Sequence, residues 1–204
     1  MASDPTVHTK SLARSPRHPK GLTDPELRRL LRAVHAGGNL RDVALIELVT
    51  GTGLRVSELL ALKVGDVEVN PRSGKVIVRK GKHGNYRTAP LTAPVRTALD
   101  AYLSTHPENK NPQAALWLGE RGALQSRSAV TRILDKYALS ARTPQLGPHT
   151  LRHTFATRYL AANPGDLRGL AALLGHAGLE TVMIYVNLNH ADFTHCHREK
   201  SKRI

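Results

Sequence analysis

Two histidines, an arginine and a tyrosine in the last third of the chain are residue types that could together attack a phosphodiester. His149 and Arg152 lie three residues apart within 148–160, whose apolar residues recur at helical period. A helix would therefore place both side chains on one face. His176 follows a glycine that ends a later apolar helix, and Tyr185 lies nine residues beyond it. A tyrosine supplies a nucleophile, and the cationic groups could stabilise negative charge on phosphate.

A second charged pair lies in the first half of the chain, between two apolar helices. Arg55 follows the Gly-x-Gly turn at 51–53, and Glu58 comes three residues later. At that spacing the carboxylate is suited to hold Arg55 or a neighbouring cation in place. An Arg-x-x-Glu pair is also commonly a surface salt bridge, and the pair alone leaves both readings open.

A short β region separates these two halves and presents a lysine. Residues 66–69, 75–79 and 86–89 alternate as strands do, which predicts a small antiparallel sheet. Lys82 would lie at the tip of the second hairpin, either as an ordinary exposed lysine or as a general acid on a movable loop. The further cations expected to meet a phosphate backbone there are Lys80, His83 and Arg87.

The remaining elements are predicted to be helical. Thr23 and Glu26 form a capping box for the first helix, and Trp117 is expected in the core. The sequence shows no internal repeat, so we expect one domain, mainly α with a small three-stranded antiparallel sheet (α+β). Helices are expected over 23–36, 40–50, 55–62, 93–103, 126–139, 148–162, 166–174 and 180–186.

Composition points to a polyanionic partner. The chain has 204 residues, 30 Lys+Arg against 16 Asp+Glu, and a formal net charge of +14. Nucleic acid is the commonest partner for such a balance, although a merely basic surface is the simpler alternative. Aromatic residues make up only 4%, which argues against a single-strand binder built on stacking. One cysteine cannot form an internal disulfide or a zinc finger, and no membrane span or signal peptide is visible, so we expect a cytoplasmic protein.

The order of these motifs resembles the tyrosine recombinase (phage integrase) family over about residues 22–190. The matching segments are TGTGLRVSELLAL at 50–62, the Gly81-Lys82 tip, HTLRHTFAT at 149–157, LLGH at 173–176 and Tyr185. Each segment is weak alone, whereas five in the family's order and spacing form a specific pattern. The resemblance implies a mainly helical catalytic domain with a small sheet, in agreement with the pattern derived above.

The resemblance also implies a site and a reaction. The catalytic set would be Arg55, Lys82, His149, Arg152, His176 and Tyr185, with Glu58 as a supporting acid. Tyr185 would form a 3′-phosphotyrosine while Lys82 protonates the leaving 5′ oxygen. The bond energy stays in that linkage and arginines hold the phosphate, so no ATP, metal or other cofactor is expected. His153 matches the family's segment without matching a catalytic position, and is expected to be structural or phosphate-facing.

The resemblance further suggests how the chain is organised. Residues 1–21 would be a basic flexible arm, 22–190 the catalytic domain and 191–204 a basic tail, with the family's N-terminal core-binding domain absent. Such a chain would be either an excised catalytic domain or a naturally short member. The expected partner is double-stranded DNA in the nucleoid, bound by a homotetramer that is a monomer or weak oligomer off DNA.

Two other functions are compatible with the sequence. A lone catalytic domain that cannot assemble would nick and close DNA as a topoisomerase does. A protein with a silent site would act as a DNA-binding accessory factor.

Overall fold

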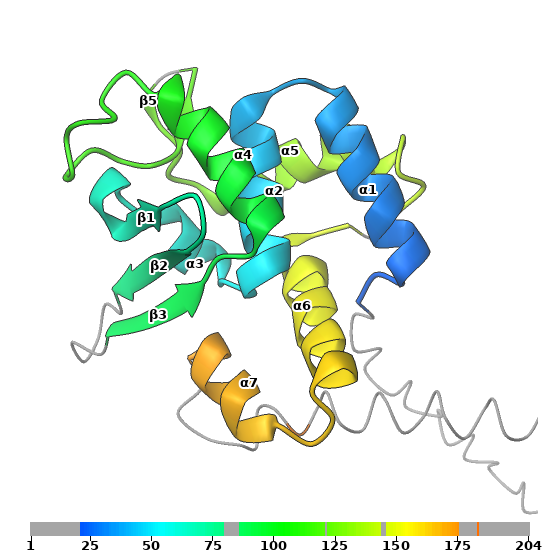
Figure 1. The fold of residues 1–204 in the computed structure, drawn as a ribbon. Helices are drawn as coiled ribbons and strands as arrows, with labels where there is room; N and C mark the ends of the chain where they lie inside the picture. Colours follow the sequence, from blue (N-terminus) through cyan, green and yellow to red (C-terminus); the bar gives the residue numbers. More distant parts are fainter. Residues whose placement is uncertain (1–20, 80–85, 121, 144–145, 176–182, 184–204) are drawn as a thin grey trace, which may run out of the picture.

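The fold is built around one nearly buried helix, α2 (Leu40–Thr52). The computed structural model describes residues 21–79, 86–120, 122–143, 146–175 and 183. Helices α1 (Asp24–Ala36), α4 (Ala93–Ser104) and α6 (Pro148–Ala162) pack against α2 (Figure 1). A helix that is apolar all round must be covered on every side, which is why α2 takes the central place.

The remaining helical elements surround this centre, and all but the 3-10 turn were expected from the sequence. They are α3 (Val56–Leu60), the 3-10 turn η1 (Val64–Asp66), α5 (Arg127–Ala138) and α7 (Leu167–Leu174). In α1, the carboxylate of Glu26 accepts from the backbone N–H of Thr23 at 2.8 Å, as the capping box requires, and it also accepts from the Thr23 hydroxyl at 2.7 Å. The carboxylate of Asp166 caps α7 by accepting from the N–H of Gly169 at 2.8 Å.

The expected three-stranded sheet is confirmed. Strands β1 (Val67–Val69), β2 (Gly74–Arg79) and β3 (Tyr86–Pro90) pair antiparallel in that order. Val76, Val78 and Ala89 are buried, so one face of the sheet lies against the helices. A second hairpin, β4 (Leu118–Gly119) with β5 (Gly122–Ala123), was not predicted because strands of two residues carry no period.

The apolar core has two parts. The larger part surrounds α2 and includes Trp117, which is buried as expected and donates its indole N–H to the carbonyl of Leu59 at 2.9 Å. A smaller cluster joins the C-terminal half of α6 to α7 through residues such as Leu160, Leu170 and Leu174. Helix α7 therefore packs against α6 through this smaller cluster, and it also contacts β3 of the sheet (Figure 1).

Two predicted boundaries differ from the structure. The second helix was predicted to end at Thr50, before the break at 51–53, but α2 continues through Thr52 and ends at the turn of Gly53. Asp66 was predicted to begin the first strand, but it lies in η1, where its carboxylate pairs with Arg79 and the N–H of Lys63. The helix expected over 180–186 lies outside the described residues, Met183 apart.

No helix in the described part of the chain is long and apolar enough to cross a membrane.

Candidate active site

The site begins at the turn between α2 and α3, which Gly53 makes possible. Gly53 has a φ of 65°, in the left-handed region that favours glycine. A Cβ added there would lie 2.4 Å from a ring carbon of Phe155 and 2.8 Å from a methyl carbon of Leu174. The turn therefore brings the start of α3 against α6 and α7, which come from the far end of the described chain.

Arg55 follows this turn and is held by Glu58. The Arg55 Nη1 donates to Glu58 Oε1 at 3.1 Å, and the Arg55 backbone N–H donates to Glu58 Oε2 at 2.8 Å. The Glu58 side chain is buried, whereas that of Arg55 is 36% exposed. The contact expected from their spacing is present, between a largely buried carboxylate and a partly exposed guanidinium.

Arg152 approaches the same place from α6. Its side chain is buried, with Nη1 donating to the carbonyl oxygen of Gly53 at 2.6 Å and Nη2 to that of Leu174 at 3.0 Å. Arg55 Nη1 also donates to the carbonyl oxygen of Leu174, at 3.1 Å. The two arginines predicted to be catalytic are thus brought together at the C-terminus of α7.

Arg87 joins this cluster, although it was expected among the exposed cations of the hairpin tip. It lies within β3, its side chain is only 13% exposed, and it grips both carboxylate oxygens of Glu58 at 2.9 and 2.8 Å. Its Nε donates to the carbonyl oxygen of Leu173 at 2.9 Å. The period of the strand could have revealed this position, because Arg87 shares a face with the buried Ala89.

The electrostatics of the cluster keep Glu58 ionised. Burial by itself would raise the pKa of Glu58, but the hydrogen bonds from Arg87 and from the backbone of Arg55 outweigh it. With the charges of the two arginines, they lower the pKa of Glu58 to about 2. The carboxylate therefore remains a fixed negative charge between the two cations at any pH at which the protein would work.

His149 lies near the cluster, one helical turn before Arg152. Its ring is exposed, and Arg127 Nη2 of α5 lies 2.5 Å from its Nε2. Because an arginine can only donate, Nε2 accepts and a neutral His149 carries its proton on Nδ1. Burial of part of the ring, followed by the charges of Arg127 and Arg152, holds the pKa of His149 below its ordinary value. His153, on the same helix, is half-buried.

Five predicted site residues lie outside the described residues: Lys80, Lys82, His83, His176 and Tyr185. Their neighbours in sequence are described. β2 ends at Arg79 and β3 begins at Tyr86, and α7 is capped by Gly175 at a φ of 63°. The roles expected for these five residues stay predictions.

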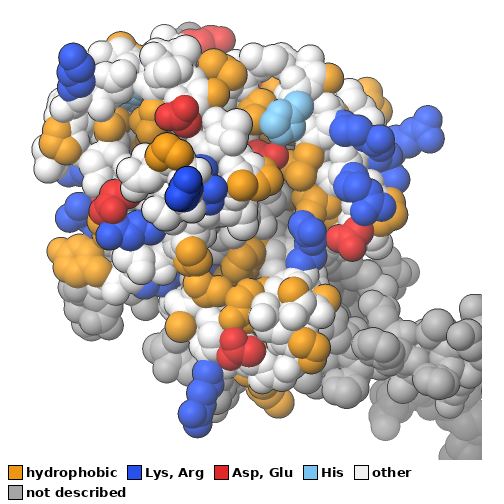
Figure 2. Space-filling view, in the orientation of Figure 1, with side chains coloured by type: hydrophobic (Ala, Val, Ile, Leu, Met, Phe, Trp, Pro, Cys, Tyr) orange, Lys and Arg blue, Asp and Glu red, His pale blue; other side chains and the backbone are white. Residues whose placement is uncertain are grey.

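The described part of the site holds the guanidinium groups of Arg55 and Arg152 in place. Their partners are backbone carbonyls, and for Arg55 also the ionised carboxylate of Glu58. Guanidinium groups bind phosphate oxygens through paired N–H donors, so a phosphate is the ligand that this arrangement suits. Other cations lie elsewhere: Figure 2 shows Lys and Arg side chains over α1, which carries Arg28, Arg29 and Arg32.

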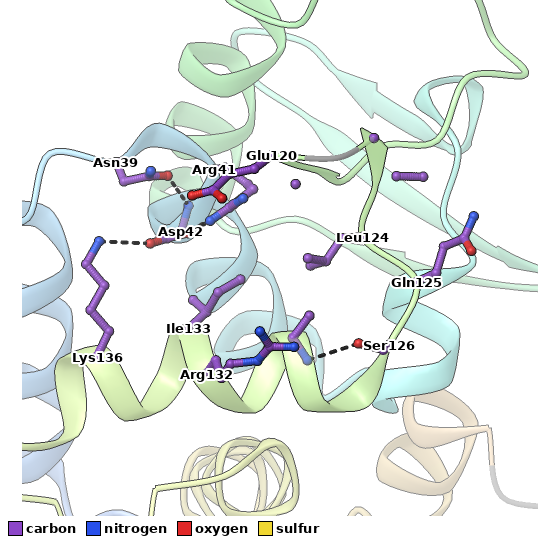
Figure 3. Close-up of a pocket in the computed structure, with 14 residues that line it drawn as sticks. Asn39, Arg41, Asp42, Glu120, Leu124, Gln125, Ser126, Arg132, Ile133 and Lys136 are labelled. Carbon is purple, nitrogen blue, oxygen red and sulfur yellow. Dashed lines mark hydrogen bonds and ion pairs between the residues drawn. The ribbon is translucent and has the colours of Figure 1, made fainter.

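A separate cavity of about 750 Å³ opens between the start of α2, the β4–β5 hairpin and α5 (Figure 3). None of the clustered arginines lines it. At its edge the buried Asp42 accepts from Arg41 and Tyr137, and Lys136 lies 3.4 Å away. Arg41 also donates to the carbonyl oxygen of Leu118 at 2.9 Å. This network joins α2, α5 and the β4–β5 hairpin, and we read it as structural.

Comparison with known proteins supports one family. The phage integrase family matches residues 20–192. Tyrosine recombinase XerC of Actinobacillus pleuropneumoniae is 34% identical over 197 residues, covering 96% of this chain and 62% of the relative. Tyrosine recombinase XerD of Ralstonia nicotianae is 39% identical over 194 residues, covering 92% of this chain and 62% of the relative. This chain thus spans about three fifths of these relatives' length.

Solved structures agree. The crystal structure of XerA recombinase superposes with a TM-score of 0.77 at 31% identity, covering 94% of this chain and 67% of that one. The XerH site-specific recombinase bound to difH substrate in a pre-cleavage complex gives a TM-score of 0.70 at 27% identity, covering 85% and 54%. The matched fold, the ordered motifs and the extent of the match lead to one conclusion: the chain belongs to the phage integrase family.

Proposed function

We propose that this chain is the catalytic part of a site-specific DNA recombinase that cuts and rejoins double-stranded DNA through a 3′-phosphotyrosine. The observation that carries the proposal is the convergence of Arg55 and Arg152 on the carbonyl oxygen of Leu174. Two guanidinium groups held beside one backbone acceptor suit the non-bridging oxygens of one phosphate. The names of the relatives, tyrosine recombinases and site-specific recombinases, support the same reaction.

In the proposed reaction the phenol oxygen of Tyr185 attacks the phosphorus and the bond to the 5′ oxygen breaks. A free tyrosine has a pKa of about 10, so ionising it at neutral pH costs roughly 4 kcal/mol. Arg55, Arg152 and His176 would offset much of that cost and stabilise the charge that grows on the phosphate. His149 would assist the transfer of the phenol proton or hold the phosphate, and Lys82 would protonate the leaving 5′ oxygen.

In the described geometry Arg127 occupies the accepting Nε2 of neutral His149, so His149 would accept a proton only after this contact is released. Its pKa is held below the ordinary value, so the neutral form predominates near neutral pH. Rejoining runs the same steps in reverse, with a 5′ hydroxyl attacking the phosphotyrosine. The bond energy is retained throughout, so the scheme assigns no step to ATP, and the arginines take the part that a metal ion could play.

The partner in this proposal is double-stranded DNA, and strand exchange would require four protomers on two duplexes. XerH, a solved relative, is described in complex with its difH substrate. The net charge of +14 favours DNA binding and predicts that affinity falls steeply with salt. The proposal places the protein in the cytoplasm, on the nucleoid.

A nicked suicide substrate tests the proposal. The chain would be incubated with duplexes nicked beside a randomised sequence, so that cleavage releases a short strand and traps the covalent product. The expected result is a protein–DNA adduct that survives denaturation and is absent from the Tyr185→Phe variant. Tight binding without an adduct on any sequence would refute the proposal and leave a silent DNA-binding protein. Relaxation of supercoiled plasmid without recombinants would instead indicate a nicking-closing activity.

A further inference from the structure

The Arg87 side chain is held entirely by groups of the cluster, and the reaction scheme gives it no role. All three guanidinium nitrogens donate to internal acceptors. Two of them bind Glu58 and one binds the carbonyl oxygen of Leu173. A bidentate pair of this kind fixes both the distance and the plane of the carboxylate. Arg87 therefore connects β3, α3 and the C-terminus of α7.

We propose that Arg87 is a positioning residue of the site, which holds Glu58 and the end of α7 so that Arg55 faces the phosphate. The inference rests on the proposed function and deepens it. Glu58 touches both arginines, so displacing Arg87 would release the acid that orients Arg55. Leu173 and Leu174 supply adjacent carbonyls to Arg87 and Arg55, so displacing Arg87 would also loosen the acceptor that Arg55 shares with Arg152.

The packing around Arg87 argues against a direct contact with DNA. All three of its guanidinium nitrogens donate to Glu58 and to the carbonyl oxygen of Leu173. The guanidinium lies so close to the end of α7 that a Cβ at Gly175 would come within 2.8 Å of its Nη1. A DNA phosphate could reach this group only by displacing Glu58 or α7.

A matched variant separates positioning from ordinary stabilisation. Arg41 makes the same kind of contacts away from the site, with Nε and Nη2 on Asp42 and Nη1 on the carbonyl oxygen of Leu118. Arg87→Met and Arg41→Met each remove an arginine from a buried acid and a backbone carbonyl. We expect both variants to unfold at lower urea concentration than the wild type.

Adduct formation should distinguish the two variants. In single-turnover assays on a trapped suicide sequence, Arg87→Met should form the adduct roughly 10- to 100-fold more slowly, as expected for a misplaced catalytic group. Arg41→Met, where folded, should form it at the wild-type rate. Arg87→Lys should recover part of the rate, because lysine restores the charge without the bidentate grip.

The pH profile supplies a readout that lost stability would not change. The charged groups that act on Glu58 among the described residues are Arg87 on β3 and Arg55 before α3, while α7 contributes backbone carbonyls. Without Arg87 the burial of Glu58 remains, so the pKa of Glu58 should rise and cleavage should fall as the pH drops below neutrality. The double variant with Glu58→Gln and Arg87→Met should no longer show this fall in cleavage at acidic pH.

The outcomes are distinct for the two proposals. If Arg87→Met cleaves at the rate and with the pH profile of Arg41→Met, the positioning role is refuted. If the wild type forms no adduct, the proposed function fails, and NMR titration of the Glu58 side-chain carboxyl carbon decides the inference alone. A higher pKa of Glu58 in Arg87→Met than in the wild type would support it, and an unchanged pKa would overturn it.

Discussion

Arg55 and Arg152 donate hydrogen bonds to one acceptor, the carbonyl oxygen of Leu174, at 3.1 and 3.0 Å. Leu174 is the last residue of α7, where unpaired carbonyls carry the negative end of the helix dipole. The end of α7 thus sets the separation of the two guanidinium groups. His176 comes two residues later in sequence, so one short helix connects three of the predicted catalytic positions.

Arg152→Ala should abolish cleavage while DNA affinity stays within about tenfold, because one phosphate contact among several is lost. The free energy of unfolding should fall by about 1–3 kcal/mol, since the buried carbonyls of Gly53 and Leu174 lose a donor. Adduct assays, binding titrations at fixed salt and urea unfolding measure the three quantities.

Arg152→Lys is the control for charge. Lysine keeps the positive charge but cannot bridge the two carbonyls as a planar fork does, so cleavage should remain strongly impaired. A collapse of DNA affinity in Arg152→Ala would mean that Arg152 anchors the DNA rather than stabilising the transition state.

Gly53→Ala should destabilise the fold far more than Gly38→Ala. Both glycines have a φ near +65°, so both variants incur the cost of a left-handed alanine, roughly 1–2 kcal/mol. Nothing lies within 4 Å of a Cβ at Gly38, whereas at Gly53 it would overlap Phe155 and Leu174. Overpacking should add about 1–3 kcal/mol for Gly53→Ala. Equal losses in thermal or urea unfolding would show that α6 and α7 are not seated against this turn.

Asp42→Asn tests the buried network beside the cavity of Figure 3. Its carboxylate accepts from Arg41 and Tyr137 at the junction of α2 and α5, so the amide would leave Arg41, whose side chain is 22% exposed, without its anion. The expected loss is about 1.5–3 kcal/mol, the range for hydrogen bonds to a charged group. Glu68→Gln is the control, because its pair with Lys75 is half exposed and contributes at most about 1 kcal/mol. A loss for Asp42→Asn no larger than that of the control would contradict the structural reading.

The helices, the three-stranded sheet and the pairing of Glu58 with Arg55 followed from local patterns. The apolar run of α2 predicted a buried helix, and the glycine and aspartate caps of α7 marked its ends. The sharing of the Leu174 carbonyl could not be predicted, because it joins Arg55 to a residue 119 positions away. Only packing decides which backbone carbonyl a distant side chain meets.

Local patterns did not predict where the Arg87 side chain lies. A cation near a basic hairpin tip is ordinarily solvated, although strand alternation places Arg87 on the face of the buried Ala89. The structure turns it inward because Glu58, from a different element, offers both carboxylate oxygens. The partner of a buried charge is a property of the tertiary fold and not of the segment that carries it.

Arg127→Gln should raise the pKa of His149. In the wild type, partial burial and then the charges of Arg127 and Arg152 hold this pKa below the ordinary value of 6.5. Removing Arg127 leaves burial and Arg152, so the pKa should rise toward 6.5 without exceeding it. NMR titration of the His149 ring protons measures the change. Arg132→Gln, an exposed arginine on the same helix that does not act on His149, is the control.

The same shift predicts how stability depends on pH. Below pH 6.5 the unfolded chain protonates His149 before the folded chain does, so this residue's contribution to stability is present above 6.5 and is lost as pH falls through the folded pKa. Arg127→Gln should therefore lose less stability than Arg132→Gln or the wild type between neutral and mildly acidic pH. Parallel curves for the three proteins would indicate that Arg127 does not control the protonation of His149, and His149 would then owe its neutral form to burial and Arg152 alone.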